Sequence, residues 1–312
     1  MALSPDCGTI AVGGWTTPCG FDGNIDLFDR ATGALVQRLR GLPSVVLHLA
    51  FSPDGRRLAA ALWGANGIRV FDAGDAYRPL PSDSDYGDDS YWVDFARDGR
   101  LVSASYDGFV RLYAAGHYDR PAVPKARVKG MGRPRSVAFS PDGQHVAVGD
   151  RDSATVAVLS ASDLTPELFP SSAGFSDTLL TVAWSKDSPG LFAGGYNASK
   201  PDRLARRWDN GGSGKFVDIA GAENAVMQFV PLGSQQMLFA DLAGFGVIDG
   251  AGKAKRLQNL GGVDTRGARG TLRIGADART VQVKDNRSGH ELRFDLARRA
   301  VALDPGPSAK LT

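Results

Sequence analysis

The side chains that could support covalent catalysis are scattered along this chain of 312 residues. A nucleophilic Cys or Ser needs a base within reach, and the base needs a third group to hold it. Cys7 and Cys19 have no histidine near them in sequence, and the serines of the repeated Ser-Pro-Asp-Gly segments belong to turns. The chain has no His-Glu-x-x-His, Cys-x-x-Cys or glycine-rich phosphate motif. We therefore predict no catalytic residue, no metal site and no cofactor, and hence no enzyme activity in this chain.

Two segments rich in charged residues could in principle bind a ligand. The acidic segment 82–90 has Asp-x-Asp spacing that could offer oxygen atoms to Ca²⁺, but it lacks the terminal Glu of an EF-hand loop, and we favour a solvated loop. Lys200, Arg203, Arg206 and Arg207 form a basic cluster without interleaved aromatic residues. We interpret this cluster as a solvated hairpin and not as a nucleic-acid site.

The elements that position these residues follow from a repeated turn. The segment Leu49 to Leu58 contains Ser-Pro-Asp-Gly between two apolar runs, which indicates a tight turn between two buried strands. Related turns place Asp at 6, 54, 98, 142, 187 and 277, so the spacings are 48, 44, 44, 45 and 90 residues. Because 90 is twice 45, a further turn is expected near Leu232, which makes seven units.

Each unit carries a second mark at the end of its third strand. Four of these marks are Phe28-Asp29, Phe71-Asp72, Trp208-Asp209 and Phe294-Asp295. The third strands alternate between apolar and polar residues, which predicts half exposure, and a more polar strand follows each of them. The pattern therefore predicts an all-β chain with four strands in each unit, in the order buried, buried, half-exposed and polar.

The period of about 44 residues and the Trp208-Asp209 dipeptide resemble a WD40-type β-propeller. This resemblance implies an all-β, seven-bladed β-propeller of four-stranded antiparallel blades, in one domain over residues 1–305 with a C-terminal tail at 306–312. The expected blades are 1–41, 42–85, 86–130, 131–174, 175–221, 222–262 and 263–305. WD40 blades often link a Gly-His pair through Asp to the Trp, but none of the four histidines here is placed for that network. We therefore expect stability to rest on packing and backbone ladders.

Three segments suggest a narrower kinship: Asn24 to Gly33, Gly67 to Asp72 and Tyr106 to Tyr113 are similar to bacterial WD40 modules, including propellers that follow caspase-like peptidase domains. Only a stub of an innermost strand precedes the first turn, whereas the last unit has four strands. We expect residues upstream of Met1 to supply the missing strand, or the ring to close by side-chain packing alone.

The loops that join the fourth strand of one blade to the first strand of the next lie on a face where propellers often bind partners. Mixed charges with aromatic residues on this face suit a peptide better than a polyanion, because hot spots favour Trp, Tyr and Arg. We predict a partner-binding rim formed by Asp88, Asp89, Tyr91, Trp92, Arg133, Arg135, Glu223, Arg266 and Arg269. The resulting hypothesis is a non-catalytic scaffold or sensor module for a protein or peptide. The alternative is a metal-dependent hydrolase with its site at the channel mouth.

Composition constrains the partners. The net charge is +2, which gives no strong field for a polyanion, so nucleic acid is not the expected partner. The sequence has no apolar run long enough for a membrane helix and no signal-peptide pattern, so we expect a cytoplasmic protein without membrane contact. We also expect a monomer, with Cys7 and Cys19 as free thiols because one strand length separates them.

Overall fold

The computed structural model describes residues 1–14, 23–186, 189–196, 203–220, 225–232, 236–241, 244–249 and 251–259, together with the strands of the last sheet. The first three sheets contain β1 Ala2–Leu3, β2 Thr9–Val12, β3 Gly23–Asp29, β4 Leu35–Leu42; β5 Val46–Phe51, β6 Arg57–Leu62, β7 Ile68–Asp72, β8 Arg78–Leu80; and β9 Ser90–Phe95, β10 Leu101–Ser105, β11 Val110–Tyr113. The next two contain β12 Pro134–Phe139, β13 His145–Asp150, β14 Val156–Ser160, β15 Pro166–Leu168; and β16 Thr178–Trp184, β17 Leu191–Tyr196, β18 Arg203–Trp208, β19 Phe216–Ala220. The last two contain β20 Val226–Pro231, β21 Met237–Asp241, β22 Gly244–Ile248, β23 Ala254–Asn259; and β24 Leu272–Ile274, β25 Thr280–Lys284, β26 Glu291–Asp295, β27 Ala300–Leu303.

Each sheet is an antiparallel meander in which consecutive strands are neighbours. The β9–β11 sheet has three strands, and an isolated bridge between Val110 and Ala126 continues its outer edge. A single pairing, Asp150 with Leu179, joins the fourth and fifth sheets. The short 3-10 helix η1, Asn210–Gly212, is the one helical element among the described residues. None of the described segments is a helix long and apolar enough to cross a membrane.

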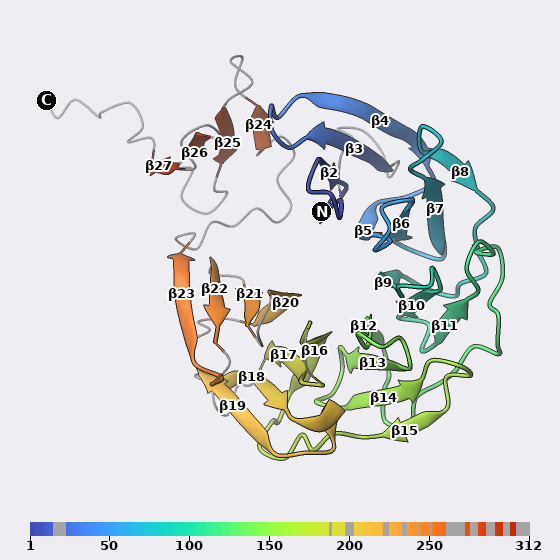
Figure 1. The fold of residues 1–312 in the computed structure, drawn as a ribbon, viewed down its shortest axis with the longest axis vertical. Helices are drawn as coiled ribbons and strands as arrows, with labels where there is room; N and C mark the ends of the chain where they lie inside the picture. The colour runs from blue at the N-terminus through green and yellow to red at the C-terminus, as the bar shows by residue number, and fades with distance from the viewer. Residues whose placement is uncertain are drawn as a thin grey trace, which may run out of the picture.

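The sheets are arranged around a central axis, and the first strand of each of the first six sheets lies nearest to it (Figure 1). The β24–β27 sheet lies between β23 and β4 in this view. The described architecture therefore confirms an all-β propeller of antiparallel blades. The single-domain limit and the seven blade boundaries stay predictions.

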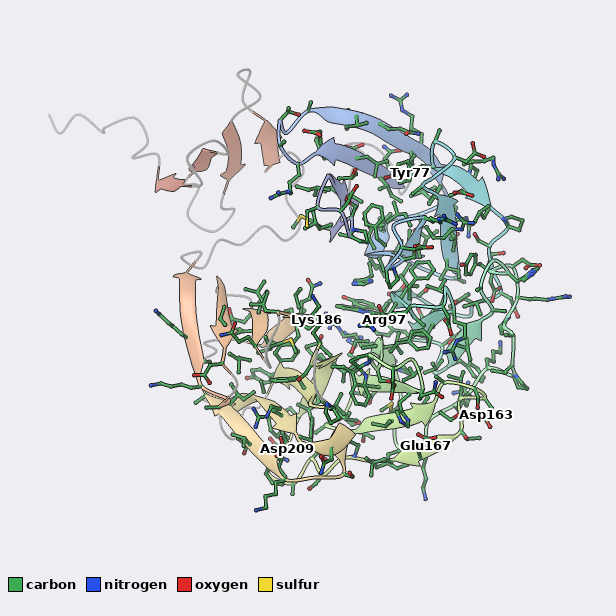
Figure 2. All side chains as sticks on the ribbon, in the orientation of Figure 1. Tyr77, Arg97, Asp163, Glu167, Lys186 and Asp209 are labelled. Carbon is green, nitrogen blue, oxygen red and sulfur yellow. The ribbon has the colours of Figure 1, made fainter. Side chains whose placement is uncertain are left out.

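The Ser-Pro-Asp-Gly turns follow the innermost strands and have a common hydrogen-bond pattern. The Ser52 hydroxyl donates to Asp54 Oδ1 at 2.5 Å and accepts from the Arg57 amide at 2.9 Å. Gly55 has a φ of 72°, a conformation that glycine adopts without strain. Figure 2 shows Arg97 and Lys186, which lie in the corresponding turns after β9 and β16, near the axis, whereas Glu167 and Asp209 lie towards the outer edge.

β3 alternates in burial as the sequence predicts, but β11 is more buried than its alternating sequence predicts. All four residues of β11 are buried, and Arg111 in its middle is fully inaccessible. Arg111 Nη2 forms an ion pair with Asp107 Oδ2 at 2.6 Å, and its guanidinium carbon lies 3.8 Å from the centroid of the Tyr86 ring. Half exposure was therefore the wrong prediction for this strand, because an arginine with an internal partner can occupy a position that the sequence pattern assigns to solvent.

The basic cluster of the fifth sheet was also interpreted wrongly. Arg206 is 1% exposed, pairs with Asp218 at 2.6 Å and donates to the carbonyl oxygens of Ser171 and Ala173. Its guanidinium lies 3.7 Å from the centroid of the Phe216 ring. Arg206 therefore fixes the connection before β16 to β18 and is not part of a solvated hairpin. Lys200 lies outside the described residues.

A buried network of hydroxyl groups joins the connection between β8 and β9 to the third sheet. The Tyr86 hydroxyl lies 2.6 Å from Ser103 Oγ and 2.7 Å from the Tyr113 hydroxyl, which donates to Asp83 Oδ2 at 2.9 Å. Burial raises the pKa of Tyr86 to about 12, so its hydroxyl keeps its proton. Stability therefore does not rest on packing and backbone ladders alone. Asp83 is buried, so the solvated-loop interpretation fails at this residue of the acidic segment.

Candidate functional site

Five consecutive innermost strands contain an extra residue near their start. In each strand the pairing with the second strand of the sheet shifts by one residue, which is a β-bulge. The residues at the shifts that face a common pocket are Leu47, Tyr91, Arg135, Leu180 and Met227. They are spaced by 44, 44, 45 and 47 residues, so they occupy the same place in successive repeats. A bulge re-aims a side chain out of the regular alternation, and here it aims five of them inward.

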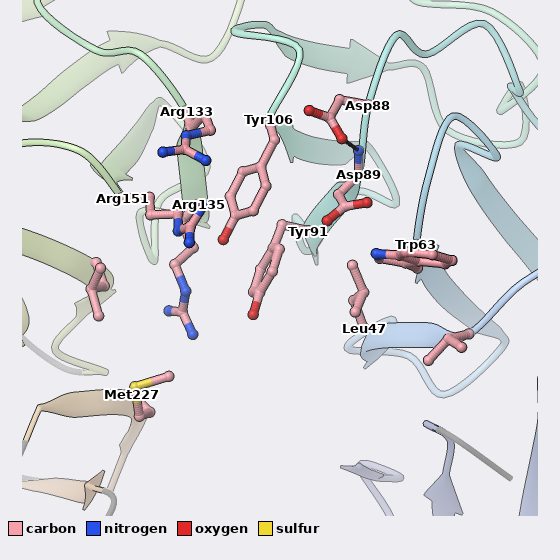
Figure 3. A pocket seen from close by; sticks show the side chains of 12 residues that line it. Leu47, Trp63, Asp88, Asp89, Tyr91, Tyr106, Arg133, Arg135, Arg151 and Met227 are labelled. Carbon is pink, nitrogen blue, oxygen red and sulfur yellow. Dashed lines mark hydrogen bonds between the residues drawn. The ribbon is translucent and has the colours of Figure 1, made fainter. Parts of the chain in front are cut away.

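These five side chains, which we call the bulge ring, line a pocket of about 560 Å³ (Figure 3). The other lining residues come from two kinds of loop. Connections that precede an innermost strand supply Val45, Asp88, Asp89 and Arg133. Turns that follow a second strand supply Trp63, Tyr106 and Arg151. The pocket therefore opens where both loop types meet, at the end of the innermost strands opposite the Ser-Pro-Asp-Gly turns.

A pair of stacked tyrosines divides the pocket. The Tyr91 and Tyr106 rings have centroids 4.6 Å apart and planes inclined by 22°. Burial raises the pKa of Tyr106, so its hydroxyl remains protonated at neutral pH. Figure 3 shows Arg133, Arg135 and Arg151 on one side of the two rings, and Asp88, Asp89 and Trp63 on the other. The pocket is therefore polarised across an aromatic wall.

The three arginines of the basic side differ in how they are held. Arg133 forms an ion pair with Asp152 at 2.6 Å, and its guanidinium lies 5.8 Å from the Tyr106 centroid. Arg151 lies 5.3 Å from the same centroid. Arg135 lies 4.9 Å from the Tyr91 centroid and is only 5% exposed. Its Nη1 is buried and has no hydrogen-bond partner in the described part of the chain.

The acidic side is built from adjacent aspartates before β9. Asp89 Oδ1 accepts a hydrogen bond from the Gly64 amide at 2.6 Å, which ties this connection to the turn after β6. Desolvation raises the pKa of Asp89, although the Gly64 amide opposes this shift. Asp88 Oδ1 accepts from the Asp89 amide at 2.7 Å. The Asp89 carboxylate therefore ties this connection to the turn after β6, while the Asp88 carboxylate stays at the surface.

Five of the nine predicted rim residues line this pocket: Asp88, Asp89, Tyr91, Arg133 and Arg135. Trp92, one residue beyond Tyr91, instead stacks on His48 with ring centroids 3.7 Å apart. Tyr91 is the unpaired residue of the β9 bulge, whereas Trp92 is paired with Ala104 in the regular ladder, which accounts for the difference. Glu223, Arg266 and Arg269 lie outside the described residues. The rim as a partner-binding surface therefore stays a prediction.

Sequence reasoning missed Tyr106 and Arg151. A signal was present, since Trp63, Tyr106 and Arg151 are separated by 43 and 45 residues and each follows the second strand of its repeat. The turns there vary in sequence, so they do not stand out as the Ser-Pro-Asp-Gly turns do. Within the described part of the chain, the lining of the pocket contains aromatic, charged and aliphatic side chains but no Cys, His or Ser. Among the described residues, no three His, Cys, Asp or Glu side chains gather as metal ligands would.

Comparisons with known proteins agree with this architecture. The WD40 family model, described as "WD domain, G-beta repeat", matches residues 126–155, which include β12 and β13. A chain in the crystal structure of a mitotic checkpoint complex is similar in fold, with a TM-score of 0.66 and 16% identity over 90% of this chain and 82% of that chain. No curated protein matches the sequence. The chain thus contains a WD40 repeat and has a structural match to a WD40 propeller.

Proposed function

We propose that this propeller is a non-catalytic scaffold that holds a peptide segment of a partner protein in the pocket at the bulge ring. The observation that carries the proposal is the Tyr91–Tyr106 stack, flanked by arginines on one side and aspartates on the other. Tyrosine and arginine are the residue types that contribute most to binding at protein interfaces. A polarised pocket can also orient an extended peptide, because each end of the peptide meets a different charge.

The experiment is selection from a displayed library of unstructured peptides against the purified protein. We expect enriched peptides that lose binding to the Tyr91→Ala/Tyr106→Ala double variant. Phe169→Ala is the matched control, because it removes a 46% exposed aromatic residue near the outer strand β15. Enriched peptides that bind the double variant as well as the wild type would show that the pocket is not the binding site, as would a selection without enrichment.

A scaffold role is compatible with two finer hypotheses. The propeller can serve as the sensor module of a larger bacterial signalling protein or of a protein with a caspase-like peptidase domain. Its support is the similarity of three repeat segments to bacterial WD40 modules. The coding sequence upstream of Met1 tests this hypothesis: an open frame that encodes a Cys/His catalytic domain would support it, and an immediate stop codon would contradict it.

The competing class is a metal-dependent hydrolase at the channel mouth. Such a site needs carboxylates, amides or histidines that converge from several blades. Metal analysis of the purified protein separates the two classes. Stoichiometric, tightly held Ca²⁺ or Zn²⁺ would contradict the pure scaffold, whereas metal-free protein that binds selected peptides would support it.

A further inference from the structure

Arg135 is a buried charge in the pocket that has no counterion among the described residues. The side chain is 5% exposed and its Nη1 is buried without a hydrogen-bond partner in the described part of the chain. Two other arginines are at least as buried, but Arg111 pairs with Asp107 and Arg206 pairs with Asp218, both at 2.6 Å. An unpaired buried charge costs several kcal/mol, so a native structure normally supplies a partner.

The nearby carboxylates do not supply that partner. Asp152 is paired with Arg133, and Asp150 Oδ1 accepts the Arg133 amide at 3.0 Å. Asp88 and Asp89 lie beyond the two tyrosine rings (Figure 3). Arg151 adds a second guanidinium to the same side of the pocket. The basic side therefore carries more positive charge than its own carboxylates neutralise.

The geometry around Arg135 fixes its guanidinium in the pocket. Its place in the β12 bulge takes the side chain out of the ladder, and the Tyr91 ring lies 4.9 Å from the guanidinium carbon. Figure 3 shows the side chain extending past Tyr91 towards Met227, into the open part of the pocket. A guanidinium held against an aromatic ring can still donate from its remaining N–H groups to an oxyanion that enters the pocket.

Resting on the proposed function, we propose that this side of the pocket binds the oxyanion of an acidic side chain in the partner peptide, with Arg135 as its direct ligand. The oxyanion is the carboxylate of Glu or Asp, or the phosphate of a phosphorylated serine. The hydroxyl groups of Tyr91 and Tyr106 offer further donors at the wall. Asp88 and Asp89 then meet the opposite end of the peptide and disfavour a second acidic residue there.

The test uses octapeptide pools with randomised flanks and one fixed central residue: Glu, phosphoserine, Gln or Lys. Binding of each pool to the protein is measured by fluorescence anisotropy. We expect the Glu or phosphoserine pool to bind about 10- to 100-fold more tightly than the Gln and Lys pools. The better of the two acidic pools identifies the source of the oxyanion.

Variants assign the preference to Arg135. Arg135→Met should remove the preference for the acidic pools, and Arg135→Lys should retain part of it, because a lysine keeps the charge but loses the planar fork. Arg97→Met is the matched control, since Arg97 is exposed in the turn at the opposite end of β9. Thermal melts confirm that each variant is folded.

The outcomes separate this inference from the proposed function. If all four pools bind equally and the Tyr91→Ala/Tyr106→Ala variant binds none of them, the pocket is a peptide site and the oxyanion inference is wrong. Preference for the Lys pool would likewise overturn it, since the aspartates would then dominate. If no pool binds the wild-type protein, the proposed peptide-binding function fails together with the inference.

Discussion

The guanidinium carbon of Arg135 lies 4.9 Å from the ring centroid of Tyr91, and both residues are the extra residue of a β-bulge in neighbouring innermost strands. The two side chains meet because the same irregularity recurs one repeat apart. No carboxylate pairs with Arg135 in the described part of the chain, as the proposed role in ligand binding requires. Its replacement should therefore affect binding and stability in opposite directions.

Arg135→Met should raise the free energy of unfolding, by about 1–3 kcal/mol, because an apolar side chain replaces a buried unpaired charge. Arg111→Met is the matched substitution of a paired arginine, and it should lower the free energy of unfolding by about 3–5 kcal/mol, because Asp107 loses its partner. Urea denaturation of both variants measures the difference. Destabilisation of similar size in both would show that Arg135 has a structural role.

Tyr86→Phe should destabilise the packing of the β8–β9 connection on the third sheet. The variant removes the hydroxyl that contacts both Ser103 and Tyr113 in a buried site, for an expected loss of about 1–3 kcal/mol. Tyr118→Phe is the comparison, since its hydroxyl makes one bond, to the Gly99 carbonyl at 3.0 Å. The prediction is wrong if chemical denaturation places the two variants in the reverse order.

Arg206→Ala should cost about 3–5 kcal/mol of unfolding free energy, because Asp218 loses its ion pair with Arg206 and the carbonyl oxygens of Ser171 and Ala173 each lose one hydrogen bond. Arg78→Ala provides the surface control. Arg78 and Asp75 are 57% and 61% exposed in their side chains, so solvent screens their pair and it contributes little to stability. Equal melting temperatures for the two variants would contradict the structural role of Arg206.

Asp94 gives the stability a specific pH dependence. Desolvation raises the pKa of Asp94 to about 7, although its carboxylate accepts the Phe139 amide at 2.8 Å. The native state therefore retains a proton that the unfolded chain releases from about pH 4 upwards, and this contribution to stability is lost as the pH rises towards 7. Asp94→Asn should remove the dependence, so its melting temperature should exceed that of the wild type progressively from pH 5 to pH 8.

His48 acts in the opposite sense and serves as the internal comparison. Desolvation lowers the pKa of His48 to about 3, and the charge of Arg135 adds to this effect. The unfolded chain therefore binds a proton at His48 below about pH 6.5, whereas the native state does not. The free energy of unfolding consequently falls as the pH decreases towards 3. Melting curves of His48→Gln should show a shallower loss of stability on acidification than the wild type. An unchanged acid limb would contradict the burial of a neutral imidazole.

The fold was predictable because the turns repeat. Ser52, Asp54 and Gly55 form a turn from local hydrogen bonds alone, so the same residue types indicate the same structure wherever they recur. The burial of Arg111 and Arg206 in two of the third strands was not predictable, because it depends on partners that other segments supply. A prediction from hydrophobic periodicity treats every arginine as exposed, because it does not include a buried carboxylate or aromatic ring that could pair with the arginine.

The site was predictable in part for a related reason. Asp88, Asp89, Arg133 and Arg135 stand at or next to the connections before innermost strands, whose location follows from the repeat. Which of two adjacent residues faces the pocket depends on the bulge. Tyr91 enters the pocket and Trp92 stacks on His48, because one unpaired residue changes the alternation at that point. A register shift of this kind leaves no mark in residue type, so spacing alone cannot reveal it.

The bulge ring places five pocket-lining side chains outside the regular strand pairings. Leu47, Tyr91, Arg135, Leu180 and Met227 lie where the ladders shift, so exchange of their side chains leaves the regular strand pairings on either side in place. A combinatorial library restricted to these five codons would vary the size, charge and aromatic content of one cavity on an unchanged framework. Variants with new binding specificities can thus be selected by changing only these five equivalent positions of the repeat.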